Sequence, residues 1–125
     1  FHDLSCDLTE PAQVERLAAT IAAELGPPDV VVSKAGGYLL RRLADTTAEE
    51  FDRQVAVNLR SAFLVARAFL PSMRAVGRGS YITVGSVADH VGFPENAAYA
   101  AGKYGLRGLH ETLAAAEAVA DEVDA

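Results

Sequence analysis

The chain has 125 residues, of which half are hydrophobic, and its 11 basic and 17 acidic residues give a formal net charge of −6. This length suits one domain (residues 1–125) with a single core. The acidic balance disfavours nucleic acid and anionic membranes, because such binding needs clustered basic residues and the longest cluster is Arg41-Arg42. There is also no apolar run of the roughly 20 residues that span a bilayer, and the first residues do not resemble a signal peptide.

Cysteine and histidine usage predicts no metal site. Cys6 is the only cysteine, which excludes an intrachain disulfide and a thiolate cage for zinc. The histidines His2, His90 and His110 are far apart and lack ligand spacing, so they are interpreted as surface or half-buried residues. These features are typical of a soluble protein in a reducing cytoplasm.

The first third of the chain predicts a helix followed by a strand. Residues 7–9 look like the end of a strand that enters a helix capped by Thr9, and Glu10-Pro11 suit its opening positions. Apolar residues then repeat at helical spacing up to the stop at 26–28. Residues 29–33 are β-branched and apolar without alternation, which is typical of a parallel strand covered on both faces. A tight turn at 35–37 follows.

The remainder predicts a long helix, a strand and a last helix. Residues 47–50 form a capping-box pattern, and the helix that they open closes near Pro71. Residues 81–84 form a second buried strand, and a helix runs from about Ala97 into the alanine-rich end. Such alternation predicts an α/β fold, a Rossmann-like doubly wound parallel sheet with helices on both faces. Ligands of such sheets bind beyond the carboxyl ends of the strands, here 33–37 and 85–86.

A possible proton-transfer pair lies on the last predicted helix. Tyr99 and Lys103 are four residues apart, so they share one helix face. A tyrosine phenol ordinarily has a pKa near 10, which makes it a poor acid or base at neutral pH. A positive charge about 4 Å away stabilises the phenolate by roughly 4 kcal/mol at an effective dielectric near 20. General acid/base catalysis is therefore feasible, although this spacing alone is common in helices without any catalytic role.

Two more polar residues accompany this pair. Ser86 stands at a predicted strand end, where its hydroxyl could donate to a substrate carbonyl oxygen while Tyr99 protonates it. Asn58 lies among apolar neighbours in the long helix, where a buried amide costs a kcal/mol or more unless it finds partners. Taken alone, Asn58 is equally consistent with a satisfied polar residue of the core.

These segments resemble the active-site pattern of the short-chain dehydrogenase/reductase family. Val57-Asn58-Leu59, Val84-Gly85-Ser86 and Tyr99 to Lys103 occur in the family's order and at its intervals. Their flanks, 69–73 and 105–109, match as well. Asp7-Leu8-Thr9 resembles the family's adenine-side motif, and 33–36 its N-N-A-G turn. The resemblance covers Asp7 to about Ala115.

The resemblance implies hydride transfer between NAD or NADP and a small-molecule carbonyl or secondary alcohol. It makes Tyr99 the acid/base and Ser86 the group that polarises the carbonyl. Lys103 would lower the tyrosine pKa and hold the nicotinamide ribose, and Asn58 would position a relay water. It further implies a homodimer or homotetramer that pairs through the two long helices. Together with Asn58, Tyr99 and Lys103, the residues implied to bind cofactor are Asp7, Leu8, Ser33, Ala35 and Gly36.

The chain also departs from the family pattern. Lys34 stands where the family turn has an amide, and we expect this side chain to point outward. No glycine-rich turn follows a strand, although such a turn holds the cofactor pyrophosphate in the family. A strand and a substrate loop that the family has at this point are also missing between about Ala115 and Glu117. The fold is therefore predicted to be incomplete, either as a deletion product or as part of a longer chain, which an intact mass would distinguish.

Three hypotheses remain open from the sequence. The first is an oxidoreductase. The second is a non-catalytic fragment or scaffold that keeps the packing but cannot bind the cofactor unaided. The third is a related isomerase or lyase reaction, against which the intact set of Asn58, Ser86, Tyr99 and Lys103 argues. The substrate and the choice between NAD and NADP lie beyond the sequence.

Overall fold

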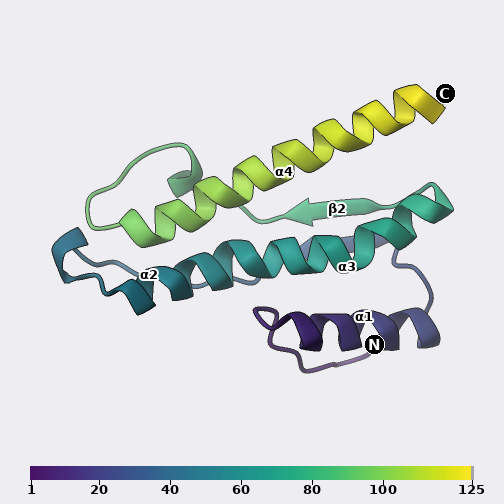
Figure 1. Cartoon of the computed structure of the whole chain (residues 1–125), viewed down its shortest axis with the longest axis horizontal. Coiled ribbons are helices and arrows are strands. Elements are labelled where there is room, and N and C mark those ends of the chain that lie inside the picture. Colours follow the sequence, from purple (N-terminus) through teal and green to yellow (C-terminus); the bar gives the residue numbers. More distant parts are fainter. Residues whose placement is uncertain (125) are drawn as a thin grey trace.

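The computed structural model describes the backbone of residues 1–124 and the side chains of residues 1–117, arranged as a small parallel sheet with packed helices (Figure 1). The described residues form two strands, three α-helical segments of 8 to 16 residues and one long final helix, with two short 3-10 turns and one π-helical turn between them. In chain order the elements are α1 (Pro11–Glu24), β1 (Val30–Ser33), η1 (Leu43–Asp45), α2 (Ala48–Val55), η2 (Ala56–Arg60), α3 (Ser61–Val76), β2 (Ser80–Thr83), η3 (Val87–Asp89) and α4 (Ala97–Asp124).

The two strands pair in parallel, as the alternation of helices and strands predicted. Val30 lies opposite Ser80 and Ser33 opposite Thr83. The pairing continues past the last register pair, because the Val84 amide donates to the Ser33 carbonyl at 3.1 Å. Both strands therefore end together, and the residues that follow them start from one edge of the sheet.

Helices cover one face of this sheet in the described part of the chain. On that face Val31 and Tyr81 pack against the α3 residues Val65, Phe69 and Met73, and α1 joins the same cluster. Helix α4 lies on the same side, because the His110 Nδ1 atom is 3.1 Å from the Thr83 hydroxyl. The opposite face exposes a set of branched apolar side chains, each 46–55% exposed: Val30, Val32, Ile82 and Val84.

This arrangement confirms the parallel α/β class and refines the predicted layers. The strands are apolar on both faces, as in a sheet with helices on both sides, whereas the described helices α1, α3 and α4 all lie on one side. Right-handed crossovers that step along a sheet in one direction place successive helices on the same side, which accounts for the single layer. None of the described helices is long and apolar enough to cross a membrane.

The prediction for the N-terminal segment is wrong in two respects. Residues 1–10 contain no strand, and Thr9 does not cap α1. The Asp7 carboxylate accounts for both, because its Oδ1 atom accepts from the Thr9 amide at 2.9 Å and from the Thr9 hydroxyl at 2.7 Å. Such a local turn competes with extended backbone, and it directs the Thr9 hydroxyl toward Asp7 instead of toward the first turn of α1. The N-cap position is instead Glu10, which makes no side-chain cap.

The predicted long helix exists but is interrupted. Its capping box is confirmed: the Thr47 hydroxyl accepts from the Glu50 amide, and the Glu50 carboxylate accepts from the Thr47 amide, both at 3.0 Å. Between α2 and α3, however, η2 is a π-helical turn, which the apolar periodicity did not indicate. The helix then passes Pro71 and ends at Gly77, whose φ of 73° suits glycine.

Candidate active site

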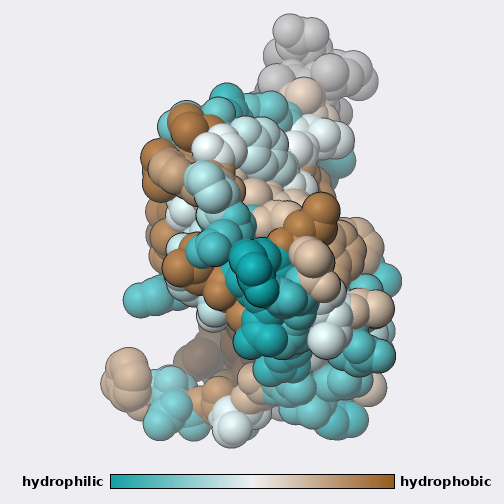
Figure 2. Space-filling model, turned by 90° about the vertical axis from the view of Figure 1, so that its left-hand side faces the viewer, coloured by the Kyte–Doolittle hydropathy of each residue, from teal (hydrophilic) through white to brown (hydrophobic). Residues whose placement is uncertain are grey.

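The polar residues singled out in the sequence gather at the carboxyl end of the sheet. In Figure 1 the β2 arrow points to this end, where α2 and α4 begin. Figure 2 looks onto the same end and shows hydrophilic side chains crossing the middle of the surface between more hydrophobic patches. Ligands of parallel sheets bind at this position, so the topology and the residue types indicate the same place.

Asn58 is at the centre of this end and is only 1% exposed. It lies in the π-helical turn η2, and its amide is satisfied from two sides. The Oδ1 atom accepts from the Gly37 amide at 3.2 Å, and Nδ2 lies 2.9 Å from both the Gly37 and Gln54 carbonyls. A buried amide with these partners fixes the turn after β1 onto the helix, which removes the desolvation cost noted for an unpaired group.

Lys103 and Tyr99 lie one turn apart on α4 and are brought together as predicted. The Lys103 ammonium is 5.8 Å from the centroid of the Tyr99 ring and donates to the Val84 carbonyl at 3.2 Å. Lys103 is 6% exposed, whereas Tyr99 is half-buried. The ring of Tyr38 packs edge-on against Tyr99, with centroids 4.8 Å apart. These contacts join α4 to the segments that follow both strands.

Glycines bring α4 close enough for these contacts. A Cβ atom on Gly102 would lie 3.0 Å from the Asn58 Cβ and 3.1 Å from the Gln54 carbonyl oxygen. A Cβ atom on Gly36 would lie 2.7 Å from the Asn58 Oδ1 and 3.6 Å from the Lys103 Nζ. Asn58 and Lys103 therefore reach the same point of the turn after β1, and glycine is required on both sides of the contact.

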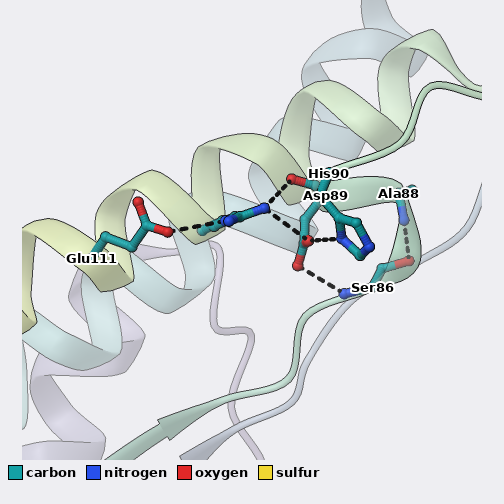
Figure 3. A network of polar contacts seen from close by, with 6 residues as sticks. Ser86, Ala88, Asp89, His90 and Glu111 are labelled. Carbon is teal, nitrogen blue, oxygen red and sulfur yellow. Dashed lines mark hydrogen bonds and ion pairs between the residues drawn. The ribbon is translucent and has the colours of Figure 1, made fainter.

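Ser86 begins the 3-10 turn η3 directly after β2. Its Oγ atom accepts from the Ala88 amide at 3.1 Å, which leaves the hydroxyl hydrogen available to a ligand. The Ser86 amide donates to the Asp89 carboxylate at 3.2 Å (Figure 3). Among the described polar contacts, Ser86 is connected to α4 only indirectly, through Asp89, whose Oδ1 atom is 3.9 Å from the Arg107 guanidinium.

The residues implied to bind cofactor divide into two groups. Gly36 belongs to the contact with Asn58 and Lys103, whereas Leu8, Ser33 and Ala35 line a groove of about 430 Å³ beside β1. Asp7 is exposed in its own turn, and the hydrogen bond from the Thr9 hydroxyl lowers the pKa of its carboxyl. Lys34 is exposed and lines the same groove.

Sequence reasoning missed several residues of this end. Gln54 stands four residues before Asn58, a helical spacing that could have indicated their contact. Asp89 completes the pattern Ser-x-x-Asp from Ser86, which is a capping-box signal readable from the sequence. Tyr38 carried no such signal, because its contact with Tyr99 depends on the loop after β1.

A family model described as short chain dehydrogenase matches residues 1–123. The chain belongs to the short-chain dehydrogenase family. It is 35% identical over 108 residues to D-beta-hydroxybutyrate dehydrogenase of Rhizobium meliloti (strain 1021), covering 86% of this chain and 42% of that protein. It is 37% identical over 114 residues to the 3-oxoacyl-(acyl-carrier-protein) reductase of Escherichia coli (strain K12), covering 89% and 46%.

Solved structures agree with this family membership. A metagenomic short-chain oxidoreductase in complex with NADP superposes with a TM-score of 0.86 at 34% identity, over 90% of this chain and 51% of that one. The chain thus spans less than half the length of these two curated relatives and about half of this solved structure. The fold is that of part of a short-chain dehydrogenase.

Proposed function

We propose that this chain carries the acid/base half of an NAD(P)(H)-dependent oxidoreductase that interconverts a small carbonyl compound and a secondary alcohol. The observation that carries the proposal is the placement of Lys103. Its buried ammonium lies beside the Tyr99 ring, bonds the residue that precedes Gly85-Ser86, and approaches the turn held by Asn58. Family membership supports the same reaction class, since relatives carry the names of dehydrogenases and reductases.

In the proposed reaction Tyr99 supplies the proton. During carbonyl reduction the phenol of Tyr99 gives its proton to the carbonyl oxygen, and in alcohol oxidation the phenolate takes it back. The Lys103 ammonium favours the phenolate electrostatically, because it carries a positive charge in a site with little water. The Ser86 hydroxyl donates to the same oxygen, a role for which its hydrogen is free, because its described bond, from the Ala88 amide, is an accepted one.

The residues present fit a nicotinamide cofactor. Lys103 uses one of its donors on Val84 and retains two others for ribose hydroxyls. Gly36 lets the turn after β1 lie against the Asn58 Oδ1 atom and close to the Lys103 ammonium, so a ligand held by Lys103 would lie beside this turn. A bound cofactor would supply or accept the hydride. Asn58 holds the 36–37 turn in this proposal, and a relay water beside it remains part of the hypothesis.

Cofactor titration and a matched pair of tyrosine variants test this function. Tyr99→Phe removes the phenol, whereas Tyr104→Phe makes the same change on an exposed side chain of the same helix. We expect Tyr99→Phe to lower kcat by about 100-fold or more, without weakening the quenching of NADPH fluorescence, and Tyr104→Phe to leave both unchanged. Wild-type turnover in Tyr99→Phe would refute the assignment. A verified 125-residue species that does not quench NADPH would support a non-catalytic scaffold instead.

Self-association through the long helices belongs to the same proposal. Phe63 on α3 is 44% exposed, and the Arg67 guanidinium lies 5.4 Å from its ring centroid. An aromatic ring and an arginine are residue types enriched in protein interfaces. Sedimentation of the wild type and Phe63→Glu is the test, with dissociation of the variant expected.

A further inference from the structure

The turn that carries Ser86 is folded around one carboxylate. The Asp89 Oδ2 atom accepts from the Ser86 amide at 3.2 Å, while the Ser86 Oγ accepts from the Ala88 amide at 3.1 Å (Figure 3). These two bonds form a capping box around η3. Within the turn the Ser86 oxygen acts as an acceptor, and its hydroxyl hydrogen remains free to donate to a ligand.

The backbone at Gly85 is adapted to the same carboxylate. A Cβ atom at this position would lie 2.5 Å from the Asp89 Oδ2, so any other residue would displace the carboxylate. The Asp89 side chain is 18% exposed and lies over the turn instead of extending into solvent. The strand end and the carboxylate thus form one unit.

Arg107 connects this unit to the catalytic helix. Its Nη1 atom lies 3.9 Å from the Asp89 Oδ1 and 3.5 Å from the Asp89 carbonyl oxygen. Arg107 follows Lys103 by four residues and Tyr99 by eight, so all three share one face of α4. Lys103 therefore contacts the segment before Ser86, at the Val84 carbonyl, and Arg107 contacts it after Ser86, at the Asp89 carboxylate.

We propose that Asp89 and Arg107 are positioning residues that dock the Ser86 turn on the face of α4 carrying Tyr99 and Lys103, so that the serine hydroxyl and the tyrosine phenol reach one substrate oxygen. The inference rests on the proposed function. It goes beyond the four-residue active-site pattern, because neither Asp89 nor Arg107 belongs to it.

Other charged groups near Asp89 are less suited to this task. The His90 Nδ1 atom lies 2.7 Å from the Asp89 Oδ1, but His90 is half-exposed and adjacent in sequence, so it cannot tie the turn to another element. Glu111 contacts Arg107 at 3.0 Å from the side away from the turn. Of the described charged groups, Arg107 alone joins Asp89 to α4.

Amide hydrogen exchange tests the docking without any need for activity. In Asp89→Ala we expect the Ser86 amide to exchange about tenfold faster than in the wild type, because its acceptor is lost. The Val84 amide, bonded to Ser33, should be unaffected. Asp29→Ala is the matched control, since the Asp29 carboxylate is exposed and its described partner is the exposed Arg78, at the opposite end of the strands. Exchange at Ser86 within twofold of the wild type would overturn the docking.

Turnover tests the catalytic consequence in the same variants. Asp89→Ala should lower kcat by about tenfold while the NADPH dissociation constant stays within twofold, because positioning and not cofactor binding is lost. Asp89→Asn, which keeps an acceptor for the Ser86 amide, should recover part of that loss and covers the case in which the alanine variant fails to fold. Arg107→Gln should resemble Asp89→Asn.

The two measurements separate this inference from the proposed function. Faster exchange with unchanged kcat would overturn the positioning role and leave the proposed function intact. If the wild type shows no turnover, the proposed function fails, and exchange at Ser86 still decides whether Asp89 holds the turn.

Discussion

The carboxyl end of the sheet contains two polar anchors, one built from uncharged groups and the other from charged side chains. The Asn58 junction (Gly36, Gly37, Gln54, Asn58 and Gly102) is uncharged, and its central amide is 1% exposed. The Ser86 turn (residues 84–90) lies at the rim and is held by a carboxylate and a guanidinium that are 18% and 49% exposed. Each anchor attaches a different strand end to the helices.

The difference follows from the cost of desolvation. A neutral amide can be buried when each of its groups is hydrogen-bonded, whereas a buried charge costs several kcal/mol even when paired. At the rim, water offsets part of that cost, so charges can serve there. The junction should therefore contribute much stability that depends little on pH or salt, and the turn should contribute less stability that depends on both.

The largest expected effect is on the Asn58 junction. Asn58→Ala leaves the Gly37 amide and carbonyl without their partner inside the fold, and we expect a loss of about 2–4 kcal/mol in the free energy of unfolding, measured with urea. Asn96→Ala is the control, because Asn96 is also buried but its Oδ1 atom has no described partner. Equal losses in the two variants would mean that burial, and not the bonds to Gly37, decides the cost.

A second variant tests the close approach of α4 to the junction. Gly102→Ala places a methyl group 3.0 Å from the Asn58 Cβ and 3.1 Å from a backbone oxygen, which cannot rotate away. We expect a loss of about 1–3 kcal/mol in the free energy of unfolding. Gly108→Ala on the same helix meets nothing within 4 Å and should gain up to about 1 kcal/mol from helix propensity. A gain in both variants would show that α4 does not approach Asn58 this closely.

The junction also shows how far the sequence could predict this fold. Apolar periodicity and the capping box at Thr47 identified the helices and both strands, because these signals are local. The π-helical turn at Asn58 was not predictable, since it depends on bonds to Gly37 and on the approach of Gly102, which are tertiary contacts. The family pattern named Asn58, but only the fold shows what its amide holds.

The N-terminal segment and the Ser86 turn show that local signals from short polar residues can be wrong in one place and right in another. At residues 7–9 the local signal for a strand and cap was wrong, because the Asp7 carboxylate accepts from the Thr9 amide and hydroxyl and folds these residues into a turn. At Ser86 the local pattern Ser-x-x-Asp already indicates the capping box that the structure contains. Short polar side chains have several local partners, and their choice is settled by the surrounding packing.

The Ser86 turn should respond to acid where the junction does not. The hydrogen bond from His90, followed by that from the Ser86 amide, lowers the pKa of the Asp89 carboxyl below its ordinary value of 3.8. A carboxyl whose pKa is lower in the folded state stabilises the fold above its unfolded pKa and loses that contribution as the pH falls through the folded pKa.

The measurable quantity is a difference between variants. The gap in unfolding free energy between the wild type and Asp89→Asn should be present at about pH 6 and shrink as the pH falls below about 4, because protonated aspartate and asparagine are both neutral. The gap between the wild type and Asn58→Ala should stay constant over the same range. Asp7, whose pKa is also lowered, is unchanged in each variant and cancels from both gaps. A gap for Asp89→Asn that grows in acid would reverse the sign of this argument.

The smallest effect is expected at the outer end of the charged network. Glu111 bonds Arg107 at 3.0 Å, yet both side chains are about half-exposed or more, and such i,i+4 pairs contribute little in water. Glu111→Gln should therefore leave the thermal unfolding midpoint and the exchange of the Ser86 amide unchanged within error, at low and at high salt. Asp89→Asn should move both. If the two variants had equal effects, the network as a whole would hold the turn, because the two side chains share only Arg107. If Glu111→Gln changes neither the unfolding midpoint nor the exchange of the Ser86 amide, while Asp89→Asn changes both, the turn is held by the contacts of the Asp89 carboxylate itself.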